Sequence, residues 1–300
     1  MKFTEGYWEK SERANASHAM QAFIVEEIPN GMQIVAPFHI ITDRSGALDV
    51  GTITIEFTAI RKDVISVRSW HFEGYQRKEP RFELNKDMQD VDVEITDEKA
   101  IMTAGRMQVC VDRKDFKIEY KADGKVLTTC GFRNIGYMQY DRSNSTKFPE
   151  SNYMYSDYTP YMNTELSLAP GECVYGMGER FTSFVKNGQV VDCWNEDGGT
   201  ASQISYKNIP FYMTNRGYGV FVDSSDNVSF EVASEKVEYV GFSVPGEELR
   251  FDLIYGDTMK DVIRTYTDLT GKPALAPGWS FGLWLTTSFT TNYDEETTST

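Results

Sequence analysis

Short runs in which hydrophobic and polar residues alternate recur along most of the chain. A period of two places successive side chains on opposite faces of an extended strand, so each run predicts a strand. The runs are 52–57, 64–68, 91–95, 116–120, 125–127, 211–214, 218–222, 228–232, 237–242 and 249–255. Asp123-Gly124, Asn30-Gly31 and Asn187-Gly188 are turn dipeptides typical of hairpins. Many short strands at regular spacing predict a mainly β fold, an antiparallel β-sandwich.

The segment 140–161 breaks this pattern. Its residues 141–146 are polar, and the tyrosines that follow them have no clean period. We therefore expect a long irregular connection that divides the sandwich into two subunits.

A helical period appears in one place. Apolar residues recur there at helical spacing, which predicts an amphipathic helix that begins near Asp257 or Thr258 and packs on a core. Gly271 suits the position after the last turn, and Pro273 prevents continuation. The expected buried stripe is Met259, Val262, Ile263, Tyr266 and Leu269.

The pattern changes again beyond this helix. Residues 274–278 are typical of a linker, and 279–285 are almost continuously apolar, which favours a strand buried on both faces. A polar loop and the acidic start of a helix follow within 286–296, which completes the opening of a βα unit. One βα unit cannot form a domain. We therefore expect 1–273 to be a β-sandwich superdomain and 274–300 to begin a (β/α)8 barrel whose remainder is absent.

Composition narrows the classes of partner. The chain has 30 basic and 45 acidic residues, a formal net charge of −15, and no basic cluster. Nucleic acids and anionic membrane surfaces are bound through clustered Lys and Arg, so we expect no nucleic acid and no membrane as a partner. No run approaches the ~18 apolar residues of a membrane span, and no apolar signal-peptide segment follows Met1. These features predict a cytoplasmic protein.

Cysteine and histidine usage favours neither a disulfide framework nor a metal site. The four cysteines lie far apart without a C-x-x-C pair, so we expect free buried thiols. The three histidines lack metal-ligand spacing, so we expect structural roles for them and no bound metal. These residues are Cys110, Cys130, Cys173, Cys193, His18, His39 and His71.

Three segments resemble the family 31 glycoside hydrolases. The first pairs Gly-Met-Gly-Glu-Arg-Phe at 176–181 with Trp-Asn-Glu-Asp-Gly-Gly at 194–199. The second, at 206–220, begins Tyr-Lys-Asn-Ile-Pro-Phe-Tyr-Met-Thr-Asn-Arg-Gly, and the third, at 277–295, begins Pro-Gly-Trp-Ser-Phe-Gly-Leu-Trp. The second and third resemble bacterial α-xylosidases in particular. The likeness is strong from about Gly171 onward.

The resemblance implies both a fold and an activity. Family members carry an N-terminal β-sandwich superdomain of galactose-mutarotase type, followed by a (β/α)8 catalytic barrel. They are retaining α-glycosidases that use two barrel aspartates, one as nucleophile and one as acid/base, and they need no cofactor. The nucleophile lies in a Lys-x-Asp motif well beyond the first barrel strand, and no position here corresponds to it.

By this resemblance the chain is the N-terminal region of an α-xylosidase, which hydrolyses terminal α-linked xylose. We expect no catalytic residue in this chain and no activity without the absent barrel. Its partners would be an α-xyloside or related oligosaccharide and that barrel, and a homo-oligomer is left open.

Three residues are candidates for sugar contact. Many family members carry Asn-Arg-Asp in the loop after Asn187-Gly188, and the matching residue Asp197 would reach hydroxyls of bound sugar, although Glu196 replaces the Arg. Alternatively, Asp197 only caps a Gly-Gly turn. Trp194 either stacks on sugar or anchors the loop. Phe289, in the loop after the first barrel strand, would line the subsite for the cleaved xylose, or else pack on the sandwich.

Glu179 and Arg180 also match a family motif. We expect them to form a structural ion pair or to support a turn rather than to act in catalysis.

Three other functions stay open at this stage. A carbohydrate-binding or structural β-sandwich module would not need the βα start at residue 279. A mutarotase-like isomerase would need a His and acid pair in a groove, whereas the histidines here lie in the first 71 residues, away from the strongest motifs. An α-glucosidase is the nearest alternative within the family.

Overall fold

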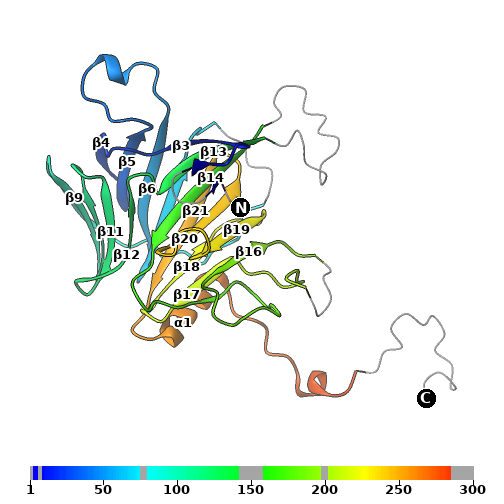
Figure 1. Ribbon diagram of the computed structural model, residues 1–300. Coiled ribbons are helices and arrows are strands. Elements are labelled where there is room, and N and C mark those ends of the chain that lie inside the picture. Colours follow the sequence, from blue (N-terminus) through cyan, green and yellow to red (C-terminus); the bar gives the residue numbers. More distant parts are fainter. Residues whose placement is uncertain (1–2, 6–8, 75–79, 142–157, 197–201, 285–300) are drawn as a thin grey trace. The chain divides into compact units, whose positions relative to one another are not determined.

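The structure is a computed structural model that describes residues 3–5, 9–74, 80–141, 158–196 and 202–284. The chain divides into two compact units, Met1–Thr270 and Gly271–Thr300. The first unit is built almost wholly from antiparallel strands (Figure 1). Within the described ranges, no helix is long and apolar enough to span a bilayer.

The largest sheet of the first unit has eight strands. Every neighbouring pair in it is antiparallel. In spatial order the strands are β15 (Val174–Gly176), β17 (Phe211–Thr214), β18 (Tyr218–Val222), β21 (Glu248–Tyr255), β7 (Val64–Trp70), β6 (Thr52–Arg61), β5 (Gly31–Pro37) and β4 (Ile24–Ile28).

Two further sheets complete the sandwich. The six-stranded sheet has the order β16 (Gln189–Cys193), β19 (Val228–Val232), β20 (Tyr239–Pro245), β14 (Tyr158–Ser167), β13 (Ile135–Asp141) and β3 (Ala14–His18). The five-stranded sheet has the order β12 (Lys125–Gly131), β11 (Lys117–Ala122), β10 (Met107–Asp112), β9 (Lys99–Ala104) and β8 (Asp92–Ile95). A short pair is formed by β1 (Thr4–Glu5) and β2 (Glu9–Lys10), and a 3₁₀ helix, η1, spans Ser45–Ala47.

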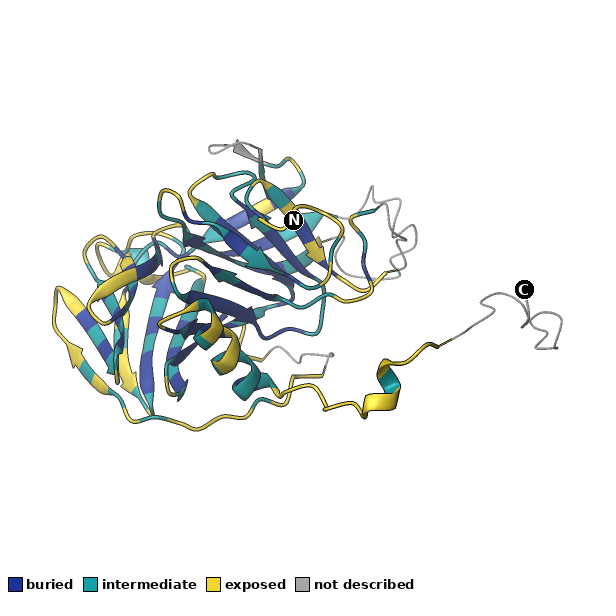
Figure 2. Cartoon of the chain, turned by 90° about the horizontal axis from the view of Figure 1, so that it is seen from below, coloured by how far each residue is buried: buried dark blue, intermediate teal, exposed yellow. Residues whose placement is uncertain are grey.

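One hydrophobic core lies between these sheets. Phe57 of β6 and Phe251 of β21 project from the same face of the eight-stranded sheet, because both are paired with Val67 of β7. Tyr120 of the five-stranded sheet contacts both rings, with centroids 6.3 and 6.4 Å apart, and Phe242 of the six-stranded sheet contacts Phe251 at 5.3 Å. Both smaller sheets therefore cover that face, and Figure 2 shows the buried residues gathered along these strands. The predicted antiparallel β-sandwich is confirmed.

The expected division of the sandwich at 140–161 is wrong. β13 continues to Asp141, and β14 already begins at Tyr158. These two residues are paired across neighbouring antiparallel strands. The intervening residues thus join adjacent strands of one sheet, so they do not separate two subunits.

The expected hairpin at Asn187-Gly188 is also wrong, although a turn is present there. Gly188 has a φ of +85°, and Gln189 N–H donates to Lys186 O at 3.0 Å. The following strand, β16, pairs with β19 rather than with a preceding strand. Asn187 Oδ1 instead accepts a hydrogen bond from Val174 N–H of β15 at 2.9 Å, which ties the turn to the other sheet.

The predicted helix is α1 (Met259–Thr270). Thr258 and Asp261 cap its first turn reciprocally: Asp261 Oδ2 accepts from Thr258 N–H at 3.2 Å, and Thr258 Oγ1 accepts from Asp261 N–H at 3.3 Å. Val262 and Leu269 are fully buried, as expected. Ile263 is 41% exposed, so its assignment to the buried stripe is wrong, because the face of α1 that contacts the sheet is narrower than the apolar stripe.

The prediction of a buried strand at 279–285 is wrong over the described residues 279–284. The structure has a 3₁₀ helix, η3 (Gly278–Phe281), in which Ser280 N–H donates to Pro277 O at 2.9 Å. Leu283 is 93% exposed. A strand forms only where neighbouring strands satisfy its backbone groups, and none of the described strands pairs with this run. Residues 286–296, expected to complete the βα unit, lie outside the described residues.

The outer face of the eight-stranded sheet carries a buried carboxyl group. Asp252 of β21 is 0% exposed and lies opposite Ser66 of β7. The pKa of Asp252 is raised to about 7, first of all by burial and also by the nearby Asp223, while the hydrogen bond from Ser66 and the charge of Arg250 partly offset these effects. An acid held in this way is partly protonated at neutral pH.

Candidate functional site

The structure describes Trp194 but not Asp197 or Phe289. These two residues lie outside the described ranges, so their assignments stay predictions. Trp194 directly follows β16, in which Val191 and Cys193 are buried and the alternate residues are not. Its side chain is 48% exposed. The alternation of the strand thus places Trp194 on the outward side.

Two backbone segments meet beside Trp194. Asn195 and Ser205 form an isolated parallel bridge, and Glu196 N–H donates to Ser205 O at 3.2 Å. The side-chain amide of Asn208 donates to Trp194 O at 2.8 Å, to Ser205 O at 2.9 Å and to Asn195 Oδ1 at 2.9 Å. A single side chain therefore holds together the two ends of the segment that contains Asp197.

Arg180 completes this network. Its guanidinium donates to Asp192 O at 2.8 Å, to Gln203 O at 3.0 Å and to Met177 O at 3.0 Å, and it also donates to Asn208 Oδ1. A planar group with several fixed donors is well suited to bind carbonyl oxygens from separate segments. The expectation that Arg180 supports a turn is confirmed.

Glu179 has a different partner from the one that an ion pair with Arg180 would require. Its Oε1 lies 3.0 Å from Lys207 Nζ. The two side chains are 76% and 63% exposed, so solvent screens the pair and it adds little to stability. We call the network of Arg180, Asn208 and the Asn195–Ser205 bridge the junction, and the Glu179–Lys207 pair lies at its exposed edge.

The turn after β15 brings the two segments into backbone contact. Met177 and Gly178 have φ values of +67° and +87°. A Cβ atom on Gly178 would lie 2.1 Å from Lys207 O and 2.9 Å from Asn208 Cα. Glycine at this position thus allows the turn to pack directly against the residues that carry the Asn208 amide.

The buried thiol of the junction, Cys193, is not poised for nucleophilic attack. Burial raises the pKa of the Cys193 thiol to about 11, so the thiol stays protonated at neutral pH and is a poor nucleophile. Across the described ranges, no cluster of three or more His, Cys, Asp or Glu side chains is arranged to hold a metal ion. The arrangement is suited to positioning a loop and presenting side chains to a ligand.

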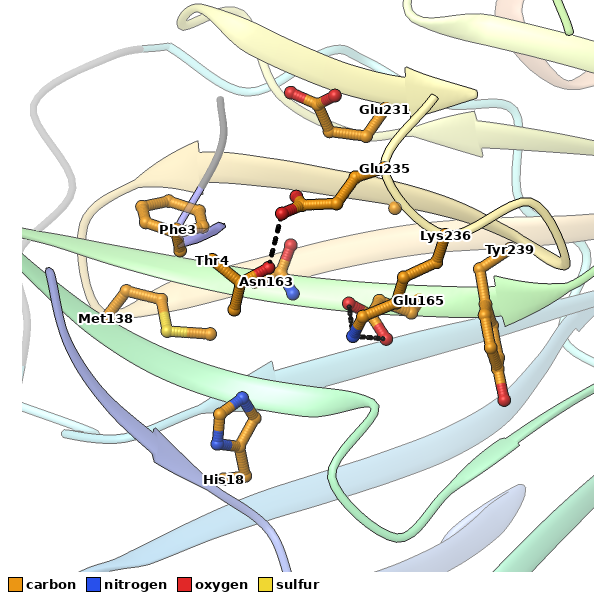
Figure 3. Close-up of a pocket in the computed structure, with 11 residues that line it drawn as sticks. Phe3, Thr4, His18, Met138, Asn163, Glu165, Glu231, Glu235, Lys236 and Tyr239 are labelled. Atoms are coloured by element: carbon orange, nitrogen blue, oxygen red, sulfur yellow. Dashed lines mark hydrogen bonds and ion pairs between the residues drawn. The ribbon is translucent and has the colours of Figure 1, made fainter. Parts of the chain in front are cut away.

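A separate polar cavity lies on the six-stranded sheet. Figure 3 shows His18 of β3, Glu165 of β14 and Glu231 of β19 around it. Lys236 Nζ forms an ion pair with both Glu165 oxygens, at 2.7 and 2.9 Å, and Thr4 donates to Glu235 at 2.7 Å (Figure 3). The sequence alone could not reveal this cavity, because its residues come from strands far apart in the chain.

The cavity is too small for a site that converts a sugar, and several of its charged side chains are already engaged in ion pairs or hydrogen bonds. Its volume is about 40 Å³, far below the roughly 300 Å³ at which pockets for small-molecule ligands begin. Its lysine is bound to Glu165, and Glu231 accepts a hydrogen bond from the Ser234 hydroxyl at 2.7 Å. The cavity is therefore suited to ordered water rather than to a pyranose ring.

The structure does contain a pair of a histidine and an acid. His71 Nδ1 lies 2.7 Å from Glu247 Oε2, and Tyr137 donates to Glu247 Oε1 at 2.9 Å. The His71 ring stacks on Tyr137, with centroids 3.9 Å apart, and on Phe38, with centroids 5.7 Å apart. Both carboxylate oxygens of Glu247 are engaged, and the imidazole packs against two aromatic rings. This cluster joins β13 to the eight-stranded sheet, and it leaves no space for a substrate between the acid and the base.

This architecture and sequence are similar to those of known proteins. The model of the glycosyl hydrolase 31 N-terminal galactose mutarotase-like domain matches residues 54–231. The α-xylosidase XylQ of Lactiplantibacillus pentosus is 42% identical over 298 residues, which are 99% of this chain and 37% of that protein. An α-xylosidase of Emericella nidulans is 40% identical over 311 residues, 99% of this chain and 39% of that protein. The chain thus spans less than two-fifths of each relative.

A solved structure shares the fold. The cycloalternan-forming enzyme of Listeria monocytogenes, in complex with a pentasaccharide substrate, superposes with a TM-score of 0.71 at 18% sequence identity. The superposition covers 90% of this chain and 24% of that enzyme. At this identity the likeness concerns the fold.

Proposed function

Because this chain belongs to the family 31 glycoside hydrolases, of which it carries the N-terminal galactose mutarotase-like domain, we propose that its protein is an α-xylosidase. The observation that carries this proposal is the identity of 42% and 40% to two α-xylosidases over 99% of the chain. The substrate would be an oligosaccharide with a terminal α-linked xylose.

The proposed reaction is hydrolysis with retention of configuration. It needs two carboxyl groups about 5–5.5 Å apart, one to attack the anomeric carbon and one to protonate the leaving oxygen. We assign neither group to residues 1–300, because the family's nucleophile lies in a barrel strand, whereas the Lys-x-Asp sequence at 121–123 lies at the end of β11 in the sandwich. The described clusters agree with this, since the Glu179 carboxylate is paired with Lys207 and the Glu247 oxygens are both engaged.

The proposed role of this domain is to hold a sugar-binding loop. The junction of Arg180, Asn208 and the Asn195–Ser205 bridge fixes the two ends of the segment 197–201. We propose that Asp197, at the start of that segment, accepts hydrogen bonds from hydroxyl groups of the bound sugar. We propose that Phe289 fills the space near C5 of the cleaved xylose, where glucose carries its hydroxymethyl group.

The substrate assignment is tested by comparing two aryl glycosides. The full-length enzyme should hydrolyse an aryl α-xyloside with a higher kcat/KM than the matching α-glucoside. Phe289→Ala should lower kcat/KM on the xyloside and raise the relative activity on the glucoside, because a removed clash helps only the larger sugar. A wild type that prefers the glucoside would indicate an α-glucosidase, and an unchanged ratio in the variant would remove Phe289 from the specificity argument.

Asp197→Asn tests the loop. In the full-length enzyme we expect kcat/KM to fall by a factor equivalent to ~1–3 kcal/mol, the scale of a charge-assisted hydrogen bond. The melting temperature should change little, because the amide keeps the size of the carboxylate. Asp192→Asn is a matched control, since Asp192 lies on the exposed side of β16 and its carboxylate accepts from Ser229 at 2.6 Å. If kcat/KM stays within about twofold for Asp197→Asn, the segment is scaffolding.

A further inference from the structure

We propose that residues 80–91 form a strap that closes over the outer face of the eight-stranded sheet while Asp252 is protonated and opens when Asp252 loses its proton. The proposal goes beyond the proposed function, because it concerns a conformational change within the sandwich. The strap has no regular secondary structure, and most of its residues are exposed. A segment that buries so little of itself can open while the sheet stays folded.

The strap follows strand β21 along this face. Arg81 Nη2 lies 2.6 Å from Glu248 Oε1, and Leu84 packs against the apolar cluster that contains Ile254. Glu248, Asp252 and Ile254 are separated by even numbers of residues on one strand, so their side chains share a face. Because the strap contacts β21 on both sides of Asp252, it passes over this carboxyl group.

Aromatic rings close the same place from the side. Phe221 of β18 is paired with Asp252, and the ring of Phe82 on the strap lies against it, with centroids 5.7 Å apart. Tyr266 of α1 also lies against Phe221, with centroids 5.5 Å apart, and burial raises the pKa of its hydroxyl, which thus stays uncharged at neutral pH. These contacts place the strap between the carboxyl group of Asp252 and the solvent.

The groups around Asp252 stabilise its carboxylate only in part. The pKa of Asp252 is raised to about 7, first of all by burial. Asp223, which follows β18, adds to the rise, whereas the hydrogen bond from Ser66 of β7 lowers the pKa. The charges of Arg250 on β21 and Lys86 on the strap also lower it. The buried Nε of Arg250 has no hydrogen-bond acceptor among the described residues, so this guanidinium does not form a two-bond pair with the carboxylate.

Closure and protonation are therefore coupled. When the strap opens, the carboxyl group meets water and its pKa returns toward the usual 3.8. The closed form thus binds the proton of Asp252 more tightly than the open form. Opening becomes easier as the pH rises from about 4 to about 7 and levels off above pH 7, where Asp252 is ionised in both forms.

Backbone amides of the strap report its position. Three of them donate to carbonyl oxygens outside the strap: Asn85 to Leu269 at 2.8 Å, Asp87 to Ile60 at 2.8 Å and Gln89 to Ala59 at 2.9 Å. These bonds break when the strap leaves the sheet, so exchange of the three amide hydrogens with deuterium measures its opening.

Hydrogen exchange of the full-length protein at pH 5 and pH 8, corrected for the intrinsic rate at each pH, tests this coupling. In the wild type, we expect the protection factors of the strap amides to fall at least about tenfold from pH 5 to pH 8. They should stay constant in Asp252→Asn, which has no proton to lose. Asp115→Asn, at an exposed position, is the matched control and should behave like the wild type. Leu84→Ala should lower the protection at both pH values by one factor, because it weakens the strap without changing Asp252.

Three results would overturn the proposal. Strap amides with the same protection at both pH values would show that Asp252 stays buried when the strap opens. Protection as high as that of the amides of β7 at both pH values would show that the strap is released only by global unfolding. An equal fall in Asp252→Asn would assign the pH dependence to another group.

Discussion

Asp252→Asn is expected to make the protein more stable at pH 8 by on the order of 4 kcal/mol and to change its stability little at pH 4. The folded-state pKa of Asp252 is raised from 3.8 to about 7, first of all by burial. The folded protein thus binds this proton more tightly than the unfolded chain. The stability that the group contributes is complete below pH 4 and is lost as the pH rises from about 4 to about 7. The asparagine variant has no charge to bury, so its free energy of unfolding does not fall over this pH range.

Urea unfolding of both proteins between pH 4 and pH 8 measures the effect as the difference of the two free energies of unfolding. Asp223, Arg250 and Lys86 also act on Asp252, so the ionic strength should be held constant. Asp115→Asn, at an exposed position, is the control, and its free energy of unfolding should follow that of the wild type at every pH. A difference that is the same at every pH would show that Asp252 is ionised throughout, against its assignment as a protonated buried acid.

Gly178→Ala is expected to lower the free energy of unfolding by about 3–5 kcal/mol, the sum of a backbone and a steric cost. The residue has a φ of +87°, which is unfavourable for alanine, and the new methyl group would lie 2.1 Å from Lys207 O. The clash lies in backbone, so it cannot be relieved by rotating a side chain. Movement of Lys207 would also displace Asn208, so substrate binding should weaken together with stability.

Gly188→Ala separates the two costs. Gly188 has nearly the same φ, +85°, but a Cβ atom there would meet nothing within 4 Å. We expect this variant to lose only about 1–2 kcal/mol. Thermal or urea unfolding of the two variants gives the comparison. Equal losses would mean that the turn around Gly178 can move away from Lys207, and the tight packing of the two segments would not be required.

Local patterns predicted the strands well where most of the residues of the strand are buried. The runs 211–214, 218–222 and 228–232 coincide with β17, β18 and β19, because their aromatic and β-branched residues fit a pleated surface. β3, with the sequence Ala-Asn-Ala-Ser-His, has small side chains and gave no such signal. The hairpin predicted at Asp123-Gly124 is confirmed, since β11 pairs with β12 across it, but local patterns do not predict the pairing of strands that are distant in the chain. Strand order depends on contacts such as Phe251 with Val67, which are distant in the chain.

The candidate site shows the same limit. The motif that contains Arg180 was visible, but three of its acceptors are backbone carbonyls, which have no signature in a sequence. The pair of His71 and Glu247 was missed because 176 positions separate the two residues. The run 279–284 misled in the other direction, since hydrophobicity indicates that a segment can be buried but not that strands are present to pair with it.

The order of the eight-stranded sheet has a consequence for synthesis of the protein. β7 lies between β6 and β21, and Glu248, which pairs with Trp70, follows it by about 180 positions. At 5–20 residues per second, roughly 10–40 s pass between the synthesis of β7 and that of its second neighbour. During this time the nascent chain presents an open, mostly apolar strand edge, which can pair with other chains. A chaperone that covers strand edges should therefore raise the soluble yield most during translation, before residue 255 has left the ribosome.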